Sequence, residues 1–226
     1  MKQFFVTATD TDAGKTHVTS LLLKLAVQHK KKAAGFKPIA AGAEEAFGRL
    51  VNTDALTLIE SGNTNVLYEQ VNPFIFAPPI APHIAAAQQG EHISVSKLRS
   101  AYDEFKSCGA DILITEGAGG WLLPINDTEL LSDWVLAEQL PVILVVGMKL
   151  GCLNHALLTM EVLAHQGIHV AGWIANQVDP QMQEYDANLA TLKARLPAPF
   201  LGESPYTEHT PKLKIHRALM ELFELG

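Results

Sequence analysis

The sequence has few cysteines, no long apolar run and no excess of positive charge. The two cysteines, Cys108 and Cys152, are too few for a disulfide framework and lack the spacing of metal ligands. The longest apolar candidate, residues 142–146, is far too short to cross a bilayer. The N-terminal residues have neither the length nor the cleavage pattern of a signal peptide. We therefore expect a reduced, cytoplasmic protein that binds no membrane.

The formal net charge of −7 argues against a nucleic-acid partner. Proteins that grip phosphate backbones usually carry the opposite sign. The one basic run, residues 30–32, follows an apolar periodic segment, where a helix dipole favours cations. An acidic protein that binds a small anion must therefore build a local positive site.

The length of 226 residues fits one domain, and 48% hydrophobic residues supply an ample core. Short apolar runs predict strands at 4–8, 33–39, 111–115, 141–146, 170–175 and 200–202. Amphipathic segments between them predict helices at 15–29, 54–61, 94–108, 130–140, 154–166 and 181–196, and a last such segment covers 212–225. Four strands are apolar on both faces. We therefore expect a single α/β domain over residues 1–226, with three layers and a mostly parallel central sheet.

The stretch 62–90 is less regular than the rest. Proline pairs such as Asn72-Pro73 and Ala81-Pro82 restrict its backbone and end regular structure. A loop of this length in a compact domain is usually functional. We expect it to pass over the active site.

A phosphate-binding loop is indicated between the first strand and the first helix. Gly14-Lys15-Thr16 stands where backbone N–H groups, a lysine charge and a hydroxyl can hold phosphate and magnesium. The strict pattern is not met, because Ala8 replaces the opening glycine and five residues separate it from Gly14. A strand–helix turn that binds nothing is the alternative, and the position in the chain argues against it.

Charged residues also lie where other predicted elements begin or end. Lys37 lies near the end of the second strand, and the carboxyl ends of parallel strands face the ligand crevice, so it should point at whatever Lys15 holds. Glu116 ends the third strand and Asp54 opens a helix. With the Thr16 hydroxyl, these carboxylates are hard oxygen donors suited to Mg²⁺. The alternatives are a snorkelling lysine, a helix-capping acid and a solvated carboxylate.

Another helix start follows the strand at 141–146. Asn154 is a good N-cap, and free N–H groups around it could bind a carboxylate, although an ordinary capped helix explains the pattern as well. Cys152 has no base near it in sequence, so we interpret it as a small buried residue and not a nucleophile. The nine histidines show no metal-ligand spacing.

Taken together, these segments resemble dethiobiotin synthetase, a family with a P-loop NTPase-like fold, along nearly the whole chain. In that family's phosphate loop, five residues before Gly-Lys-Thr are normal. The matching segments are 9–16, 37–42, 52–54, 72–73, 82–83, 116–121, 145–155, 171–173 and Asn176. Their order and spacing make the resemblance far more specific than any single motif.

The resemblance implies a homodimeric ligase that uses ATP, Mg²⁺ and CO₂ to close a cyclic urea on 7,8-diaminononanoate. In this family the diamine first takes up CO₂ as a carbamate, and ATP then phosphorylates that carbamate. Lys15 and Lys37 would hold the phosphates and the carbamate, which Thr11 would help to orient. Thr16, Asp54 and Glu116 would bind magnesium.

The resemblance also implies how the two ends of the ligands are held. Contacts with ATP are implied for Asp12, Ala13, Gly14, Lys15, Thr16, His17, Asp54, Glu116, Asn176 and Pro205. Asn176 would read the adenine edge. The distant carboxylate of the substrate would be bound from the partner subunit by Gly151, Cys152, Leu153 and Asn154.

The sequence departs from the family's pattern at several positions. Ala8 stands where the family usually has glycine, and Asp12 is one methylene shorter than the common glutamate. Ala41 stands where a serine hydroxyl is often found, so we leave it out of the site. A tyrosine that the family can present to the substrate corresponds to Tyr185 or is missing.

Two other classes share parts of this pattern. Switch ATPases of the partition or nitrogenase-iron-protein type carry a second lysine early in the phosphate loop, where this chain has Asp10. Amide-forming synthases of the cobyrinate kind usually carry a further glutamine-hydrolysing domain, and no length remains for one here. Both are therefore weaker interpretations than the ligase.

Overall fold

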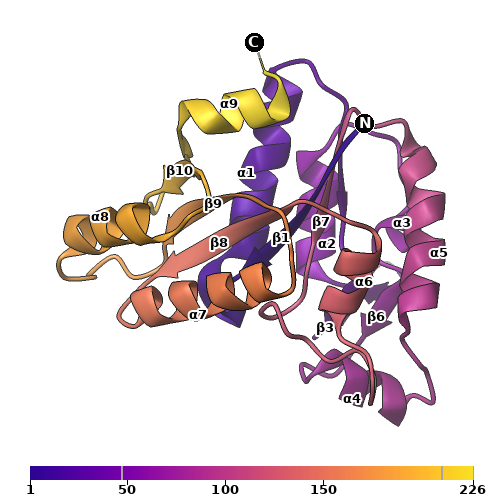
Figure 1. Cartoon of the computed structure of the whole chain (residues 1–226). Helices are drawn as coiled ribbons and strands as arrows, with labels where there is room; N and C mark the ends of the chain where they lie inside the picture. The colour runs from indigo at the N-terminus through magenta and orange to yellow at the C-terminus, as the bar shows by residue number, and fades with distance from the viewer. Residues whose placement is uncertain (47, 210, 226) are drawn as a thin grey trace.

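The computed structural model describes residues 1–46, 48–209 and 211–225. Its centre is a seven-stranded sheet in the order β11-β10-β9-β8-β1-β7-β2 (Figure 1). The strands are β1 (Lys2–Ala8), β2 (Ala33–Phe36), β7 (Ile112–Glu116), β8 (Val142–Met148), β9 (Val170–Gln177), β10 (Phe200–Ser204) and β11 (Lys214–Ile215). Neighbouring strands run parallel, except that β11 is antiparallel to β10. The mostly parallel sheet predicted from the apolar runs is confirmed.

Helices cover both faces of this sheet and complete the three predicted layers (Figure 1). One face packs against α1 (Lys15–Gln28) and α9 (Arg217–Phe223). The other face packs against α5 (Val95–Phe105), α6 (Leu131–Ala137), α7 (Cys152–His165) and α8 (Tyr185–Arg195). At the β2 edge, α2 (Thr53–Ser61) lies beside α1. Across the described ranges, no helix has the length and apolar character needed to cross a membrane.

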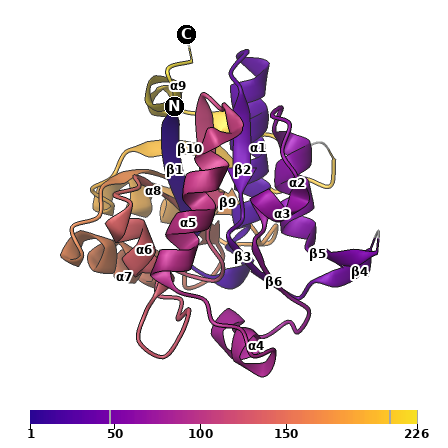
Figure 2. The same ribbon diagram turned by 90° about the vertical axis from the view of Figure 1, so that its right-hand side faces the viewer.

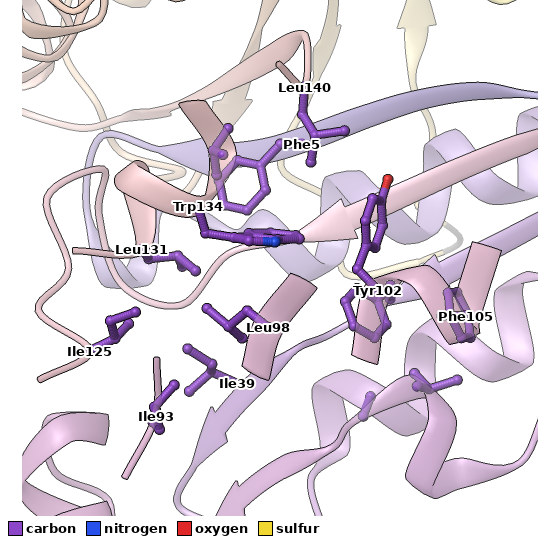
Figure 3. Close-up of a cluster of buried hydrophobic side chains, with 14 of the residues drawn as sticks. Phe5, Ile39, Ile93, Leu98, Tyr102, Phe105, Ile125, Leu131, Trp134 and Leu140 are labelled. Atoms are coloured by element: carbon purple, nitrogen blue, oxygen red, sulfur yellow. The ribbon is translucent and has the colours of Figure 1, made fainter. Parts of the chain in front are cut away.

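Alternate side chains of β1 supply both layers of the core. Phe5 belongs to the cluster under α5 and α6, whereas Phe4 and Val6 pack with α1 and α9. In Figure 3, Phe5 lies close to Trp134, which meets the ring of Tyr102 edge to face with the ring centroids 5.2 Å apart. A strand covered on both faces is a nearly continuous apolar run, which is the pattern that the sequence shows over residues 4–8.

The predicted strand 33–39 is wrong as a single strand. Pro38 has no N–H to donate to a sheet, and the chain leaves the central sheet after Phe36. The following residues form β3 (Ile39–Ala41), which pairs in parallel with β6 (Phe74–Phe76) in a separate two-stranded sheet. The N–H of Lys37 instead donates to the Val71 carbonyl at 2.9 Å. The break leaves Lys37 at the carboxyl edge of the sheet.

The stretch 62–90 holds more structure than its sequence suggested. It contains α3 (Tyr68–Val71), β6 and α4 (Pro82–Gln88). A small hairpin of β4 (Glu44–Ala46) and β5 (Arg49–Val51), which the sequence analysis did not predict, precedes it. Figure 2 shows β3, β6 and α4 at the end of the molecule away from the two termini.

Several predicted helices differ from the structure at their ends. The segment 94–108 divides into α5 and the 3₁₀ helix η2 (Lys106–Cys108), α6 ends at Ala137, and α8 begins only at Tyr185. The last segment contains β11 before α9. The prediction of Asn154 as an N-cap is wrong, because α7 begins at Cys152. The cap is Gly151, whose φ of 94° suits glycine.

Candidate active site

A cavity of about 790 Å³ opens at the carboxyl ends of β1, β2 and β7. It is lined by residues of four segments: Thr11, Asp12, Gly14, Lys15 and Thr16; Lys37, Ile39, Ala40, Ala41, Asn52 and Asp54; Pro79, Ile80, Ala81 and Pro82; and Ala118, Gly119 and Leu123. The proline-rich part of 62–90 does lie over this cavity, as predicted. Parallel topology explains the meeting of segments so distant in sequence, since all these strands end at one edge.

The phosphate loop runs through the 3₁₀ helix η1 (Thr11–Ala13) into α1. Gly14 joins them with a φ of 81°, a conformation that L side chains rarely adopt, and a Cβ there would lie 2.1 Å from Asn176 Nδ2. The side chain of Lys15 folds back over the loop, where Nζ lies 3.3 Å from the carbonyl oxygens of both Asp10 and Thr11. The loop therefore presents a lysine and a helix N-terminus to one face of the cavity.

Lys15 is almost fully buried, and burial lowers the pKa of its ammonium to about 8, with a further contribution from the positive charge of Lys37. The nearby acids oppose this effect without cancelling it. The loop thus holds the positive charge of Lys15 at an energetic cost. A bound anion would relieve that cost, as a phosphate-binding lysine requires.

Lys37 contacts the two acids among the predicted magnesium ligands. Its Nζ lies 2.5 Å from Glu116 Oε1 and 3.2 Å from Asp54 Oδ2, and it also donates to the Gly117 carbonyl at 3.1 Å. Lys37 and Glu116 are buried, which rules out the snorkelling lysine and the solvated carboxylate. Burial alone would lower the pKa of Lys37, but the two carboxylates outweigh it and raise that pKa.

These residues fit a magnesium ion. The Thr16 hydroxyl donates to Glu116 Oε1 at 2.7 Å, so three hard oxygen donors lie together. The other Glu116 oxygen, Oε2, is buried and has no hydrogen-bond partner among the described residues. The Lys37 ammonium already demonstrates that this pair of acids attracts a cation. With phosphate oxygens and waters, the set would complete six-coordination.

The predicted nucleotide contacts outside the loop lie toward β9 and β10. Asn176 is buried and donates through Nδ2 to the Ala13 carbonyl at 2.9 Å. His17 Nε2 lies 2.8 Å from Ser204 Oγ, and burial lowers the pKa of this histidine. Pro205 borders a second hollow of about 360 Å³, with Thr207, His209, Lys212 and Lys214. None of these three predicted residues lines the larger cavity.

The residues 151–154 do not line the larger cavity either. Gly151 and Asn154 are exposed at the start of α7, whereas Cys152 is buried, as predicted, and burial raises its thiol pKa. Among the described residues, no backbone hydrogen bond outside helices and strands uses the amides of Leu153 and Asn154. Leu150, directly before this helix, is 96% exposed.

Two contacts that shape the site were missed. Asn52 caps α2, its Oδ1 accepting from the Asp54 N–H at 3.1 Å; an asparagine before a predicted helix was a signal for this. Lys149 Nζ lies 2.8 Å from Asp10 Oδ2, a hydrogen bond that lowers the pKa of Asp10 and ties the loop after β8 to the phosphate loop. Nothing in the sequence joins residues so far apart.

The residues that depart from the family's pattern lie both at the cavity and away from it. Ala8 is buried at the end of β1, while Asp12 and Ala41 line the cavity. Tyr185 does not line it. The Tyr185 hydroxyl is buried without a hydrogen-bond partner in the described part of the chain, and burial raises its pKa. This hydroxyl therefore faces the protein interior.

Comparisons with known proteins identify the family. A family model described as an AAA domain matches residues 2–212. The ATP-dependent dethiobiotin synthetase of Pseudoalteromonas translucida is 64% identical over 226 residues, all of both chains. That of Escherichia coli K12 is 46% identical over 211 residues, 93% of each chain. This chain belongs to the ATP-dependent dethiobiotin synthetases. Members of this family are ligases that form a carbon–nitrogen bond of dethiobiotin in biotin biosynthesis, as the resemblance predicted.

Solved structures at low identity show the fold alone. The cell division protein FtsY of Thermotoga maritima matches with a TM-score of 0.55 at 16% identity, over 98% of this chain and 68% of that one. The MinC:MinD complex of Aquifex aeolicus matches with a TM-score of 0.54 at 13% identity, over 99% of this chain and 85% of that one. The expected P-loop NTPase-like fold is confirmed.

Proposed function

We propose that this protein closes the cyclic urea of dethiobiotin from 7,8-diaminononanoate, CO₂ and Mg-ATP, and that it does so in the cytoplasm. The observation that carries the proposal is the placement of Lys15, Lys37 and Asp54 at one cavity, with the buried Glu116 in contact with Lys37. The amines and the carbamate oxygen of the substrate supply the nucleophiles, so the protein needs only to orient reactants and stabilise charge.

The reaction divides into three balanced steps. One substrate amine attacks CO₂ and loses a proton to give a carbamate. A carbamate oxygen attacks the γ-phosphorus of ATP, ADP leaves, and a carbamic–phosphoric anhydride forms. The second amine then attacks the anhydride carbon, phosphate leaves, and loss of a proton completes the urea. Both later steps place negative charge on a departing phosphate group, which is where two lysines are useful.

The predicted site residues have distinct roles in this scheme. Lys15 would contact the β- and γ-phosphates from the loop. Lys37, released in part from the acids, would hold the γ-phosphate and the carbamate, which Thr11 would help to orient. Magnesium would be held by Thr16, Asp54 and Glu116, where it would neutralise the phosphates. Asn176 and Pro205 would hold the adenine on the β9–β10 side.

The functional alternative from another class is a nucleotide-driven switch, and the MinC:MinD cell division protein complex shares this fold at low identity. Asp10 argues against it, because this position is acidic and engaged with Lys149 Nζ at 2.8 Å. The two functions differ in what ATP turnover needs. A ligase should hydrolyse ATP slowly alone and fast only when diamine and bicarbonate are both added. Fast turnover that the diamine leaves unchanged would refute the ligase and favour the switch.

We further propose a homodimer in which α7 of one subunit completes the site of the other. The support is the helix start at 151–154. Its Leu153 and Asn154 amides, which make no backbone hydrogen bond outside helices and strands among the described residues, suit a carboxylate but lie outside the chain's own cavity. The neighbouring Leu150 is almost fully exposed, as a residue at an interface would be in an isolated subunit. The distant carboxylate of the diamine would dock there.

Mixed dimers test the shared site. Lys15→Gln disables the phosphate loop, and Asn154→Asp places a negative charge where the carboxylate should dock. In a mixed dimer with shared sites, one site carries both lesions and the other carries none. Random mixing makes about half of the dimers mixed, so activity should recover to about a quarter of the wild-type value. Verified mixed dimers without recovery would contradict the shared site.

A further inference from the structure

A closed ring of polar contacts includes the pair Lys37 and Asp54. Asn52 Oδ1 accepts from the Asp54 N–H at 3.1 Å, and the Asn52 N–H donates to the Tyr68 hydroxyl at 2.7 Å. The Tyr68 hydroxyl donates to Asn72 Oδ1 at 3.0 Å, and Asn72 Nδ2 donates to the Lys37 carbonyl at 2.7 Å. The ring closes through the ion pair of Lys37 Nζ and Asp54 Oδ2 at 3.2 Å.

The ring has a defined direction. Tyr68 has a single hydroxyl proton, which it donates to Asn72, while its hydroxyl oxygen accepts from the Asn52 N–H. Burial raises the pKa of Tyr68, which keeps this proton in place. Tyr68, Asn72 and Asn52 are all buried, so a broken link would leave a polar group unsatisfied away from water.

The ring joins elements that would otherwise move separately. Lys37 follows β2, Asp54 lies in the first turn of α2, and Tyr68 begins α3. A second contact, from the Lys37 N–H to the Val71 carbonyl at 2.9 Å, fixes the same backbone to α3. The ring therefore sets where the Lys37 ammonium stands relative to the Asp54 carboxylate.

We propose that Tyr68 and Asn72 are positioning residues that hold Lys37 against Asp54 for the reaction. The inference rests on the proposed function, since it assigns them a task in that chemistry. A positioning role does not require Tyr68 or Asn72 to touch a ligand, and neither residue lines the cavity. A small displacement of a catalytic group lowers the reaction rate far more than it lowers the affinity for the ligand.

The test compares two hydroxyl deletions in one core cluster. Tyr68→Phe removes a hydroxyl of the ring. The matched control, Tyr102→Phe, removes a hydroxyl that is also buried in this cluster but bonds to Gln3, outside the ring. Lysine-selective ¹⁵N NMR reads the buried ammonium of Lys37, assigned with Lys37→Gln. This signal should shift in Tyr68→Phe and stay unchanged in Tyr102→Phe, although both variants lose thermal stability.

Turnover gives the second readout. In Tyr68→Phe, kcat should fall on the order of tenfold or more while the KM for ATP stays within about twofold. Tyr102→Phe should keep both constants. An unshifted Lys37 signal with normal kcat in Tyr68→Phe, or equal losses in the two variants, would overturn the proposal.

A second variant breaks a different link of the ring. Asn72→Asp keeps the acceptor for Tyr68 and the side-chain volume but replaces the donor to the Lys37 carbonyl. It should therefore shift the Lys37 NMR signal as Tyr68→Phe does. An unshifted Lys37 signal in Asn72→Asp would overturn the role of the ring. The NMR readout needs no turnover. A wild-type protein that makes no dethiobiotin would therefore refute the proposed function while the ring is still decided by the spectrum.

Discussion

Nucleotide binding should be coupled to proton uptake by Lys15. This lysine is 5% exposed, and its pKa is about 8. Without nucleotide, its amine is therefore protonated in about nine-tenths of the molecules at pH 7, in about half at pH 8 and in about one-tenth at pH 9. Bound phosphates favour the charged form and should restore nearly full protonation. Uptake on binding should therefore rise from about 0.1 proton at pH 7 to about 0.9 proton at pH 9.

Isothermal titration calorimetry measures this uptake when one titration is repeated in buffers of different ionisation enthalpy. A non-hydrolysable ATP analogue with excess magnesium serves as the ligand, because protons on phosphate groups titrate near pH 6, below the window. Lys15→Met provides the control and should remove the rise. Uptake that stays flat from pH 7 to pH 9, or that persists in Lys15→Met, would refute the role of Lys15.

The same pKa predicts how stability depends on pH without nucleotide. The folded-state pKa of Lys15 lies below its ordinary value of 10.5, so the folded protein binds fewer protons between about pH 8 and 10.5. The free energy of unfolding should therefore rise with pH across this window, by at most about 3 kcal/mol. Urea denaturation should find Lys15→Met more stable than wild type below pH 8, with a difference that shrinks toward pH 10. Equal stability at pH 7 would contradict the shifted pKa.

Two further predictions concern the other site residues. Lys37→Gln should bind Mg-ATP nearly normally but turn over about 10²-fold to 10³-fold more slowly, whereas Asp54→Asn and Glu116→Gln should shift the magnesium optimum of activity upward. A near-normal rate for Lys37→Gln, or unchanged magnesium titrations for both acids, would oppose these assignments. Gly14→Ala should lower the free energy of unfolding by about 1–3 kcal/mol, because its Cβ would lie 2.1 Å from Asn176 Nδ2 at a φ that alanine disfavours. Urea denaturation measures this, and wild-type stability would show that the loop tolerates a side chain there.

The layered fold was predictable because each signal was local. The apolar runs of β1, β7, β8 and β9 and the amphipathic segments between them indicate their elements residue by residue. The break after Phe36 was missed because Ala33 to Ile39 is apolar apart from Lys37, so periodicity continues across Pro38. The start of α7 was misplaced for a related reason: Asn154 is a strong cap by type, but Gly151 adopts the backbone that begins the helix.

Only the part of the site that follows from the order and direction of the strands was predictable from the sequence. Parallel strands bring Lys15, Lys37 and Glu116 to the carboxyl edge of the sheet independently of the contacts that their side chains make. The sequence did not reveal that Lys37 pairs with both acids, because that contact depends on where β2 ends and α2 begins. For the same reason, the link from Lys149 to Asp10 and the ring through Tyr68 and Asn72 emerge only in three dimensions.

In the proposed reaction, ATP drives ring closure on a substrate carbamate at this cavity. The most direct test incubates the purified protein with Mg-ATP, 7,8-diaminononanoate and isotopically labelled bicarbonate, and follows phosphate release and product mass together. We expect a cyclic urea that carries the label, formed with one phosphate for each product molecule. Phosphate released at the same rate without diamine, with no labelled urea formed, would contradict it.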